Sequence, residues 1–253
     1  MHISPRTIRA SLLGAVALAA VGCSTAPVQK GPVVEPVFPA DRVLTEGVKY
    51  AAEVYDPWEG FNRTMYRFNY HFDRYVFLPV VNAYKAIVPD FAEKGVHNFF
   101  NNIRNVRTLI NSILQLNADK AAATTARLVL NTTFGVLGVF DVATALDVPY
   151  PREDFGQTLG YWGVGSGPYL VLPILGPSSV RDGVGVGVDG FVASEIRDRA
   201  LDLDTWQKLL WWGLDAVDTR ANIPFRYYET GTPFEYDMVR WLYTTKRQIE
   251  IAK

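Results

Sequence analysis

The spacing of hydrophobic residues between positions 57 and 76 predicts an amphipathic helix. Apolar side chains recur there at steps of three and four residues, which places them along one side of an α-helix. This apolar stripe consists of Phe61, Met65, Phe68, Phe72 and Val76. The opposite side carries Arg63, Arg67, Tyr70 and Arg74. The preceding residues predict where the helix starts, with Asp56 as the cap, Pro57 at the first helical position and Glu59 at the capping-box position.

The same periodicity predicts further helices, several of them separated by prolines. Pro79 opens a short helix to about residue 88, and Pro89 opens the next one. The stripe over residues 96–114 contains Arg107, which indicates either a break near Asn105 or an arginine that faces a polar interior; the asparagines of this segment favour a break. Other helices are predicted at about 118–131, 201–218 and 234–250.

Glycine and proline interrupt the helical pattern between residues 150 and 182. We therefore predict a loop here, with a short hairpin around Tyr169–Leu172. Residues 185–190 then spell G-x-G-x-x-G, a pattern of dinucleotide-binding proteins, but no predicted strand leads into it. We expect these glycines to let helices or loops approach closely and not to bind a nucleotide.

The first 23 residues are typical of a bacterial lipoprotein signal peptide. Arg6 and Arg9 precede an apolar run over residues 11–21, which is too short to span a bilayer. The run ends at Cys23, the only cysteine of the chain. An ordinary secretory peptide is the alternative, but it does not explain a lone cysteine at the cleavage point. We predict a signal peptide at 1–22, a lipidated N-terminus and tether at 23–55, and a helical domain at 56–250.

A lipid on Cys23 bears on how the stripe of helix 57–76 is interpreted. In a water-soluble protein such a stripe normally packs in the core. In a protein attached to a bilayer, a helix with aromatic residues on one side and arginines on the other can lie in the membrane interface. Both interpretations stay open. Trp211 and Trp212 make the helix at 201–218 apolar almost all round, which predicts that it is buried or touches lipid.

The charge of the processed chain argues against a nucleic-acid partner. Without residues 1–22, 231 residues remain, with 23 basic and 26 acidic side chains and a net charge of −3. An exported, slightly acidic protein is not expected to bind nucleic acid. Its attachment to a membrane would depend on the lipid and not on a basic patch.

Residues suited to catalysis or metal binding are scarce. His71 and His97, the only histidines after residue 22, lack the spacing of a metal-ligand pair. Ser166 lies between two glycines, but Val164 replaces the first glycine of a nucleophile elbow. We expect no catalytic residue, no metal and no cofactor other than the lipid on Cys23. Three aspartates near loops are expected to cap turns and helix starts: Asp141, Asp154 and Asp182.

Four segments together resemble the MlaA (VacJ) family of outer-membrane lipoproteins. They are DPWEGFNRTMYRFN at 56–69, GVHNFFNNI at 95–103, LNTTFGVLGVFDVA at 130–143 and EDFGQTLGYWGVGSGPYLVLPILGPSSVRD at 153–182. The positions that carry the family motifs are Asp56, Pro57, Glu59, Asn62, Arg63, Asn69, Asn98, Asn131, Asp154, Gly156, Arg181 and Asp182.

The resemblance implies a fold and a function. It implies an all-α, ring-like arrangement of amphipathic helices around a central channel, anchored in the periplasmic leaflet of the outer membrane. Such a protein is not an enzyme; it passes mislocalised phospholipids to a periplasmic carrier, MlaC, next to a trimeric porin. Phe61, Met65, Phe68 and Phe72 would face the membrane or line the channel. A Gly/Pro-rich hairpin loop would gate the channel mouth, and it includes Gly160, Gly163, Gly165, Gly167 and Pro168.

Two other functions stay open at this point. A structural lipoprotein could hold porins without moving lipid, and a lipase-like hydrolase could use a serine with His71 or His97. The first predicts no bound phospholipid, and the second predicts release of fatty acid.

Overall fold

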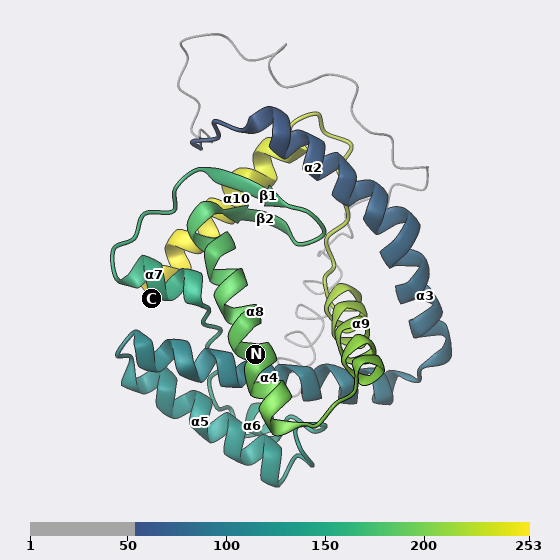
Figure 1. Ribbon diagram of the computed structural model, residues 1–253, viewed down its shortest axis with the longest axis vertical. Helices are drawn as coiled ribbons and strands as arrows, with labels where there is room; N and C mark the ends of the chain where they lie inside the picture. The colour runs from purple at the N-terminus through teal and green to yellow at the C-terminus, as the bar shows by residue number, and fades with distance from the viewer. Residues whose placement is uncertain (1–53) are drawn as a thin grey trace, which may run out of the picture. The chain divides into compact units, whose positions relative to one another are not determined.

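The computed structural model describes residues 54–253, which form a mainly helical unit (Figure 1). The helices are α2 (Glu59–Phe72), α3 (Leu78–Ile87), α4 (Asp90–Leu114), α5 (Ala118–Thr133), α6 (Val142–Ala145), α7 (Phe155–Tyr161), α8 (Val180–Ala200), α9 (Thr205–Ala221) and α10 (Glu235–Ala252). A π-helical turn, η2 (Asp73–Phe77), joins α2 to α3, and β1 (Tyr169–Leu172) pairs with β2 (Gly176–Ser179) as an antiparallel hairpin. The predicted helical class and hairpin are confirmed. The predicted signal peptide, Cys23 and the tether up to residue 53 lie outside the described residues.

The helices and strands of residues 54–253 contact one another in a closed circuit. The helix α2 continues through η2 into α3, which packs on α9; α9 contacts α4, α4 contacts α7, and α7 packs along α8. The helix α8 contacts β1, and β1 returns to α2. This circuit can be followed in Figure 1, with α5 beside α4 and α10 against α7 and β2. The ring-like arrangement is therefore confirmed, and the channel stays a prediction.

The start of α2 differs from the prediction. The helix begins at Glu59, so its N-cap position falls on Trp58 and not on Asp56, and no side chain caps it. Asp56 accepts hydrogen bonds from Asn62 (2.7 Å), Tyr236 (2.5 Å) and Arg240 (3.0 Å). Pro79 lies in the first turn of α3, as predicted, although the π-helical turn joins α2 to α3 without a break.

The predicted break near Asn105 is wrong, and so is the alternative for Arg107. The helix α4 runs without interruption through Asn105, which is buried, while Arg107 is exposed. The buried row of α4 is polar, so a search for apolar residues misjudges which side faces inward. Asn111 shows how such a residue is accommodated, because its amide donates to Asp189 (3.2 Å) and to the Arg107 carbonyl (3.1 Å).

One helix arises within the predicted loop, and a second begins at its end. Residues 155–161 form α7, and the G-x-G-x-x-G sequence lies within α8, away from the strand-to-helix turn where a phosphate would bind. A β-carbon on Gly185 would lie 2.4 Å from the main-chain nitrogen of Gly156. Close approach at Gly185 is thus confirmed, and packing of α7 on α8 outweighs the low helix propensity of glycine. Gly187 and Gly190 have open space beside them.

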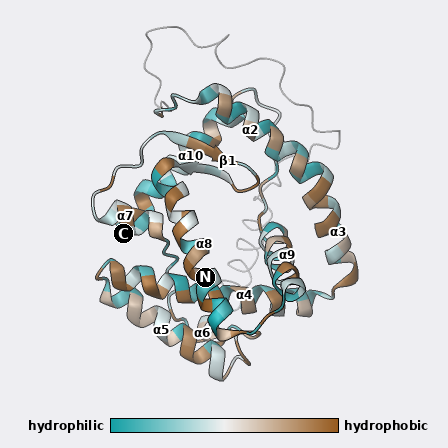
Figure 2. Cartoon of the chain, in the orientation of Figure 1, coloured by the Kyte–Doolittle hydropathy of each residue, from teal (hydrophilic) through white to brown (hydrophobic). Residues whose placement is uncertain are grey.

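The interior of the described unit is rich in polar groups. Its buried side chains include Asn62, Asn69, Asp73, Asn102, Asn105, Asn111, Thr124, Arg127, Asn131, Gln157, Asp182, Asp218, Arg220 and Glu235. Most of the buried hydrophobic side chains are tyrosines, and Tyr66 makes edge-to-face contacts with three others at ring-centroid distances of 4.9 to 5.7 Å. Hydrophobic residues instead recur along the surfaces of α2, α3 and α9 (Figure 2).

Candidate functional site

The helix α2 contacts the rest of the protein through its polar residues. The row that is buried consists of Asn62, Tyr66, Asn69, Tyr70 and the following Asp73. The apolar stripe points outward: Phe61 is 50% exposed and Phe68 44%, while Met65 and Phe72 are half-buried. The exposure of Phe61 and Phe68 contradicts the interpretation of the stripe as core packing. Its contact with lipid or with a channel stays a prediction.

Two asparagines of α2 hold the hairpin. The amide of Asn62 donates to the Tyr169 carbonyl (3.0 Å), and its oxygen accepts from the Val171 N–H (2.8 Å). Two helical turns later, Asn69 donates to the Leu172 carbonyl (3.0 Å) and accepts from the Ile174 N–H (2.6 Å). Each amide group therefore imitates a peptide unit of a neighbouring strand, which explains why asparagine occupies both positions.

The C-terminal helix α10 is joined to α2 by charged groups. Arg63 pairs with Glu59 (2.7 Å) and Asp237 (3.2 Å) and lies over the ring of Tyr236. Glu235 is almost fully buried, and it accepts hydrogen bonds from the Tyr66 hydroxyl (2.7 Å) and from the main-chain N–H of Tyr228 (2.5 Å). The predicted helix at 234–250 is thus part of the same body as α2.

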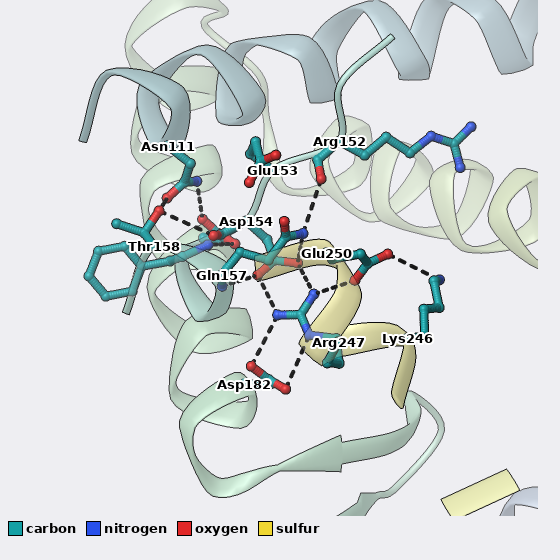
Figure 3. A network of polar contacts seen from close by, with 12 residues as sticks. Asn111, Arg152, Glu153, Asp154, Gln157, Thr158, Asp182, Lys246, Arg247 and Glu250 are labelled. Carbon is teal, nitrogen blue, oxygen red and sulfur yellow. Dashed lines mark hydrogen bonds and ion pairs between the residues drawn. The ribbon is translucent and has the colours of Figure 1, made fainter. Parts of the chain in front are cut away.

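A second charged cluster joins α10 to α7 and α8. Figure 3 shows the guanidinium of Arg247 between the carboxylates of Asp154 (2.7 and 2.8 Å) and Asp182 (3.0 Å). Burial by itself raises the pKa of Asp154, but Arg247 and the Gln157 N–H outweigh burial and hold the pKa at about 2. Burial also raises the pKa of Asp182, but hydrogen bonds from Arg247 and Tyr243 outweigh this effect and keep the pKa below its usual value.

The expectation that three aspartates cap helices holds for two of them. Asp141 accepts from the Thr144 N–H at the start of α6, and Asp154 accepts from the Gln157 N–H at the start of α7. Asp182 does not cap α8, because Ser179 does. The carboxylate of Asp182 binds Arg247 and Arg181 instead.

The glycine-rich segment lies between α7 and the hairpin. Gly163 and Gly165 have open space beside them, and Gly163 and Gly167 have positive φ values of 85° and 67°. The Arg181 guanidinium and main-chain N–H donate to the carbonyls of Val164 and Ser166, and the Pro168 carbonyl accepts from Val180 (3.1 Å). The loop is therefore exposed but tied at its base.

Gly160 is not part of this loop. It lies in α7, where a β-carbon would come within 2.5 Å of the Ile251 side chain. The structure therefore corrects the prediction that Gly160 belongs to the gate loop. Because glycine has no side chain, α7 can pack closely against α10 at this position.

Arg127 and the motif residues Asn98 and Asn131 support the α5–α6 region. Arg127 is buried and pairs with Asp141 (2.8 Å). Asn131 donates to Asp141 (3.0 Å) and accepts from the Ala143 N–H (2.8 Å). Asn98 of α4 donates to the Val139 carbonyl (3.0 Å). These residues therefore stabilise the fold through hydrogen bonds and ion pairs, and so they position the exposed segments around them.

The helix α9 exposes large hydrophobic residues. Trp211 packs edge-to-face against Phe99 and Phe100 of α4, but Trp206 is 73% exposed and Leu210 69%. Of the two alternatives for this helix, burial is contradicted for most of its length. None of the helices that the structure describes has both the length and the hydrophobicity needed to cross a bilayer.

His97 and Ser166, two residues considered for catalysis, each have a hydrogen-bond partner within the fold. His97 faces the buried carboxylate of Asp218 (3.2 Å), and the hydroxyl of Ser166 donates to the adjacent Gly167 carbonyl (3.3 Å). Within residues 54–253, no three His, Cys, Asp or Glu side chains come together as metal ligands would.

Residues 54–253 thus form a helical unit with a polar, cross-linked interior and apolar outer rows. A family model described as MlaA lipoprotein matches residues 54–250. The chain therefore belongs to the MlaA lipoprotein family, as its motifs indicated.

Curated relatives and a solved structure agree with this assignment. The intermembrane phospholipid transport system lipoprotein MlaA of Escherichia coli is 38% identical over 173 residues, 66% of each chain. The Haemophilus influenzae protein of the same name is 32% identical over 86% of this chain and 78% of its own. An uncharacterized Rickettsia prowazekii protein is 44% identical over 130 residues, and the match spans about half of that relative's length, 52%. A structure described as the structural basis for maintenance of bacterial outer membrane lipid asymmetry matches with a TM-score of 0.59 and 31% identity, over 78% of this chain and 100% of that one.

Proposed function

We propose that this protein is an outer-membrane lipoprotein that removes mislocalised phospholipids from the outer leaflet and so maintains the lipid asymmetry of the membrane. One observation carries the proposal: α2 buries the amides of Asn62 and Asn69 and exposes Phe61 and Phe68. This distribution suits a body that lies in the periplasmic leaflet with its apolar rows against acyl chains. The names of the Escherichia coli and Haemophilus influenzae relatives support phospholipid as the cargo.

A lipid in transit needs an apolar wall for its tails and a polar path for its headgroup. Helices with separate apolar and polar rows provide both, so the closed circuit of helices is proposed to surround an amphipathic channel. The loop with Gly163, Gly165, Gly167 and Pro168 is proposed to gate it, because Gly163 and Gly165 have free space around them. The covalent lipid on Cys23 would locate the protein. The trimeric porin beside it and the periplasmic carrier MlaC are proposed as partners, with no nucleic acid and no catalytic step.

Lipid mass spectrometry on the purified, membrane-extracted protein tests the proposal. We expect co-purifying phospholipid, and phospholipid accumulation in the outer leaflet when the gene is deleted. Absence of both results would overturn the proposal.

The same experiments separate the rival functions. A porin scaffold would change porin level or assembly on deletion while binding no phospholipid. A hydrolase would release fatty acid or lysolipid and would lose that activity when His71, His97 or one serine is replaced.

A further inference from the structure

The loop between α5 and α6 exposes an uninterrupted set of hydrophobic side chains. Its residues 134–140 read Phe-Gly-Val-Leu-Gly-Val-Phe and contain no polar side chain. Phe134 is 72% exposed, Leu137 65%, and Val136 and Phe140 61% each. Connecting loops usually lie in water and carry polar residues, so this composition requires an explanation.

The loop holds this exposed shape at a cost in backbone energy. Val136 and Leu137 have φ values of 51° and 58°, in the left-handed region that side chains disfavour, above all β-branched ones. Two contacts with α4 fix the loop: Asn98 donates to the Val139 carbonyl (3.0 Å), and Gly138 lies so close to Asn102 that a β-carbon would come within 2.5 Å of it. Backbone strain that is supported in this way marks a feature with a use.

Most N–H groups of the loop bond to main-chain carbonyls of the loop and of the end of α5. The N–H groups of residues 134, 135, 137, 138, 139 and 140 all donate to main-chain carbonyls, at distances of 2.8 to 3.3 Å. Water would satisfy these groups without such bonds. Hydrocarbon offers no partners, which is why irregular backbone is normally excluded from it. Main-chain partners for six N–H groups lower the cost of placing this loop in hydrocarbon.

Charged residues are also absent from the loop and from the end of α5 that precedes it. No charged residue occurs between Arg127 and Asp141, and these two side chains pair with each other at 2.8 Å. Protein interfaces of ordinary size include hydrogen bonds and a polar rim. Residues 134–140 have no side chain able to supply either, so acyl chains fit them better than a protein partner does.

We propose that residues 134–140 form a wedge that inserts into the acyl region of the bilayer, apart from the lipid on Cys23 and from α2. This inference rests on the proposed membrane seating of the protein and adds the place of deepest contact. The occupant of the surface is lipid hydrocarbon; the lack of polar groups disfavours a second copy of the chain or a protein groove.

Insertion depth can be measured because the chain has one cysteine. Two variants of the processed chain are made in a Cys23→Ser background: Leu137→Cys, and Ala122→Cys at an exposed position of α5 as the control. Each is labelled at its one cysteine with an environment-sensitive fluorophore. Vesicles of phosphatidylethanolamine and phosphatidylglycerol at about 3:1 are prepared with and without lipids brominated on their acyl chains. We expect a blue shift and quenching by bromine at position 137 only. A label at 137 that stays water-like on vesicle-bound protein overturns the proposal.

A matched pair of substitutions tests the energetic role. Leu137→Asn should weaken vesicle binding about tenfold or more, because the leucine side chain would no longer be transferred from water into the bilayer. Its thermal midpoint in detergent should stay equal or rise, since asparagine tolerates a positive φ. Leu116→Asn is the control, because Leu116 is 74% exposed with φ 55° but lies between Gln115 and Asn117. We expect it to leave vesicle binding unchanged.

The remaining outcomes are also decisive. Equal losses of vesicle binding in both variants would show a general effect of surface hydrophobicity and overturn the wedge. A change of oligomeric state with Leu137→Asn, at unchanged vesicle binding, would assign the surface to a second copy. If position 137 inserts but no phospholipid co-purifies and deletion leaves lipid asymmetry intact, the wedge stands and the proposed transport function fails.

Discussion

The junction of α2, the hairpin and α10 differs sharply from the outer rows of α2 and α9. In the junction, amides, carboxylates and guanidinium groups are buried and hydrogen-bonded to one another. On the outer rows, phenylalanine, leucine and tryptophan are exposed. A protein that folds in water normally buries its largest hydrophobic side chains. The difference indicates that the polar network holds this fold together and leaves the apolar rows exposed for the proposed contact with a membrane.

Removing one partner of a fully buried ion pair should have the largest effect on stability. Asp73 accepts two hydrogen bonds from Arg220 (2.5 and 2.8 Å) in the interior. Asp73→Ala leaves a buried guanidinium without its carboxylate, and we expect the free energy of unfolding to fall by about 3–5 kcal/mol. Denaturation in detergent micelles measures this. Asp198→Ala removes an exposed carboxylate and should leave the unfolding midpoint unchanged; equal losses would contradict a stabilising polar interior.

A pair of neighbouring substitutions on α2 tests the comparison directly. Asn62→Leu makes the buried row more hydrophobic but leaves the Tyr169 carbonyl and Val171 N–H without partners, so we expect a loss of about 3 kcal/mol. Phe61→Asn makes the outer row more polar, and it should change unfolding by less than about 0.5 kcal/mol while weakening vesicle binding. The reverse order of stabilities would show that the phenylalanine row supplies the core.

The Arg247 cluster should make stability depend on acidic pH. The pKa of Asp154 is about 2 in the folded protein, below the value of about 4 in an unfolded chain. Its stabilising effect is therefore present above about pH 4 and is lost as the pH falls towards about 2. Asp154→Asn keeps a capping side chain but removes the charge, so it should cost about 2 kcal/mol at neutral pH.

The measurement is the free energy of unfolding of both forms across this range. We expect the two curves to converge as the pH approaches 2. A constant difference between them at every pH would assign the loss to packing and not to the charge of Asp154.

The smallest effect on stability is expected in the glycine-rich loop. Gly165 has open space beside it and no positive φ, so Gly165→Leu should change unfolding by less than about 0.5 kcal/mol. Because the loop is the proposed gate, the same variant should alter outer-leaflet phospholipid content without releasing the protein from the membrane. Normal lipid content in this variant would remove the loop from the gate assignment.

Much of the helical organisation follows from local patterns in the chain. The periodicity of α2, α5, α9 and α10, and the proline and glycine residues around the hairpin, predict these elements close to where the structure places them. The errors in helix prediction share one cause. Glycine at 156 and asparagine at 105 disfavour helix locally, yet close packing and buried hydrogen bonds outweigh that preference.

The sequence by itself determined that α2 has an apolar side and a polar side, and its motifs placed the chain in a family of lipoproteins. It could not determine which side faces inward, because periodicity is the same for a helix in a core and a helix against lipid. Only the tertiary structure decided this. The side chains of Asn62 and Asn69 have to meet the main chain of residues more than 100 positions away in β1 and the following turn, and that requirement turns the phenylalanines outward.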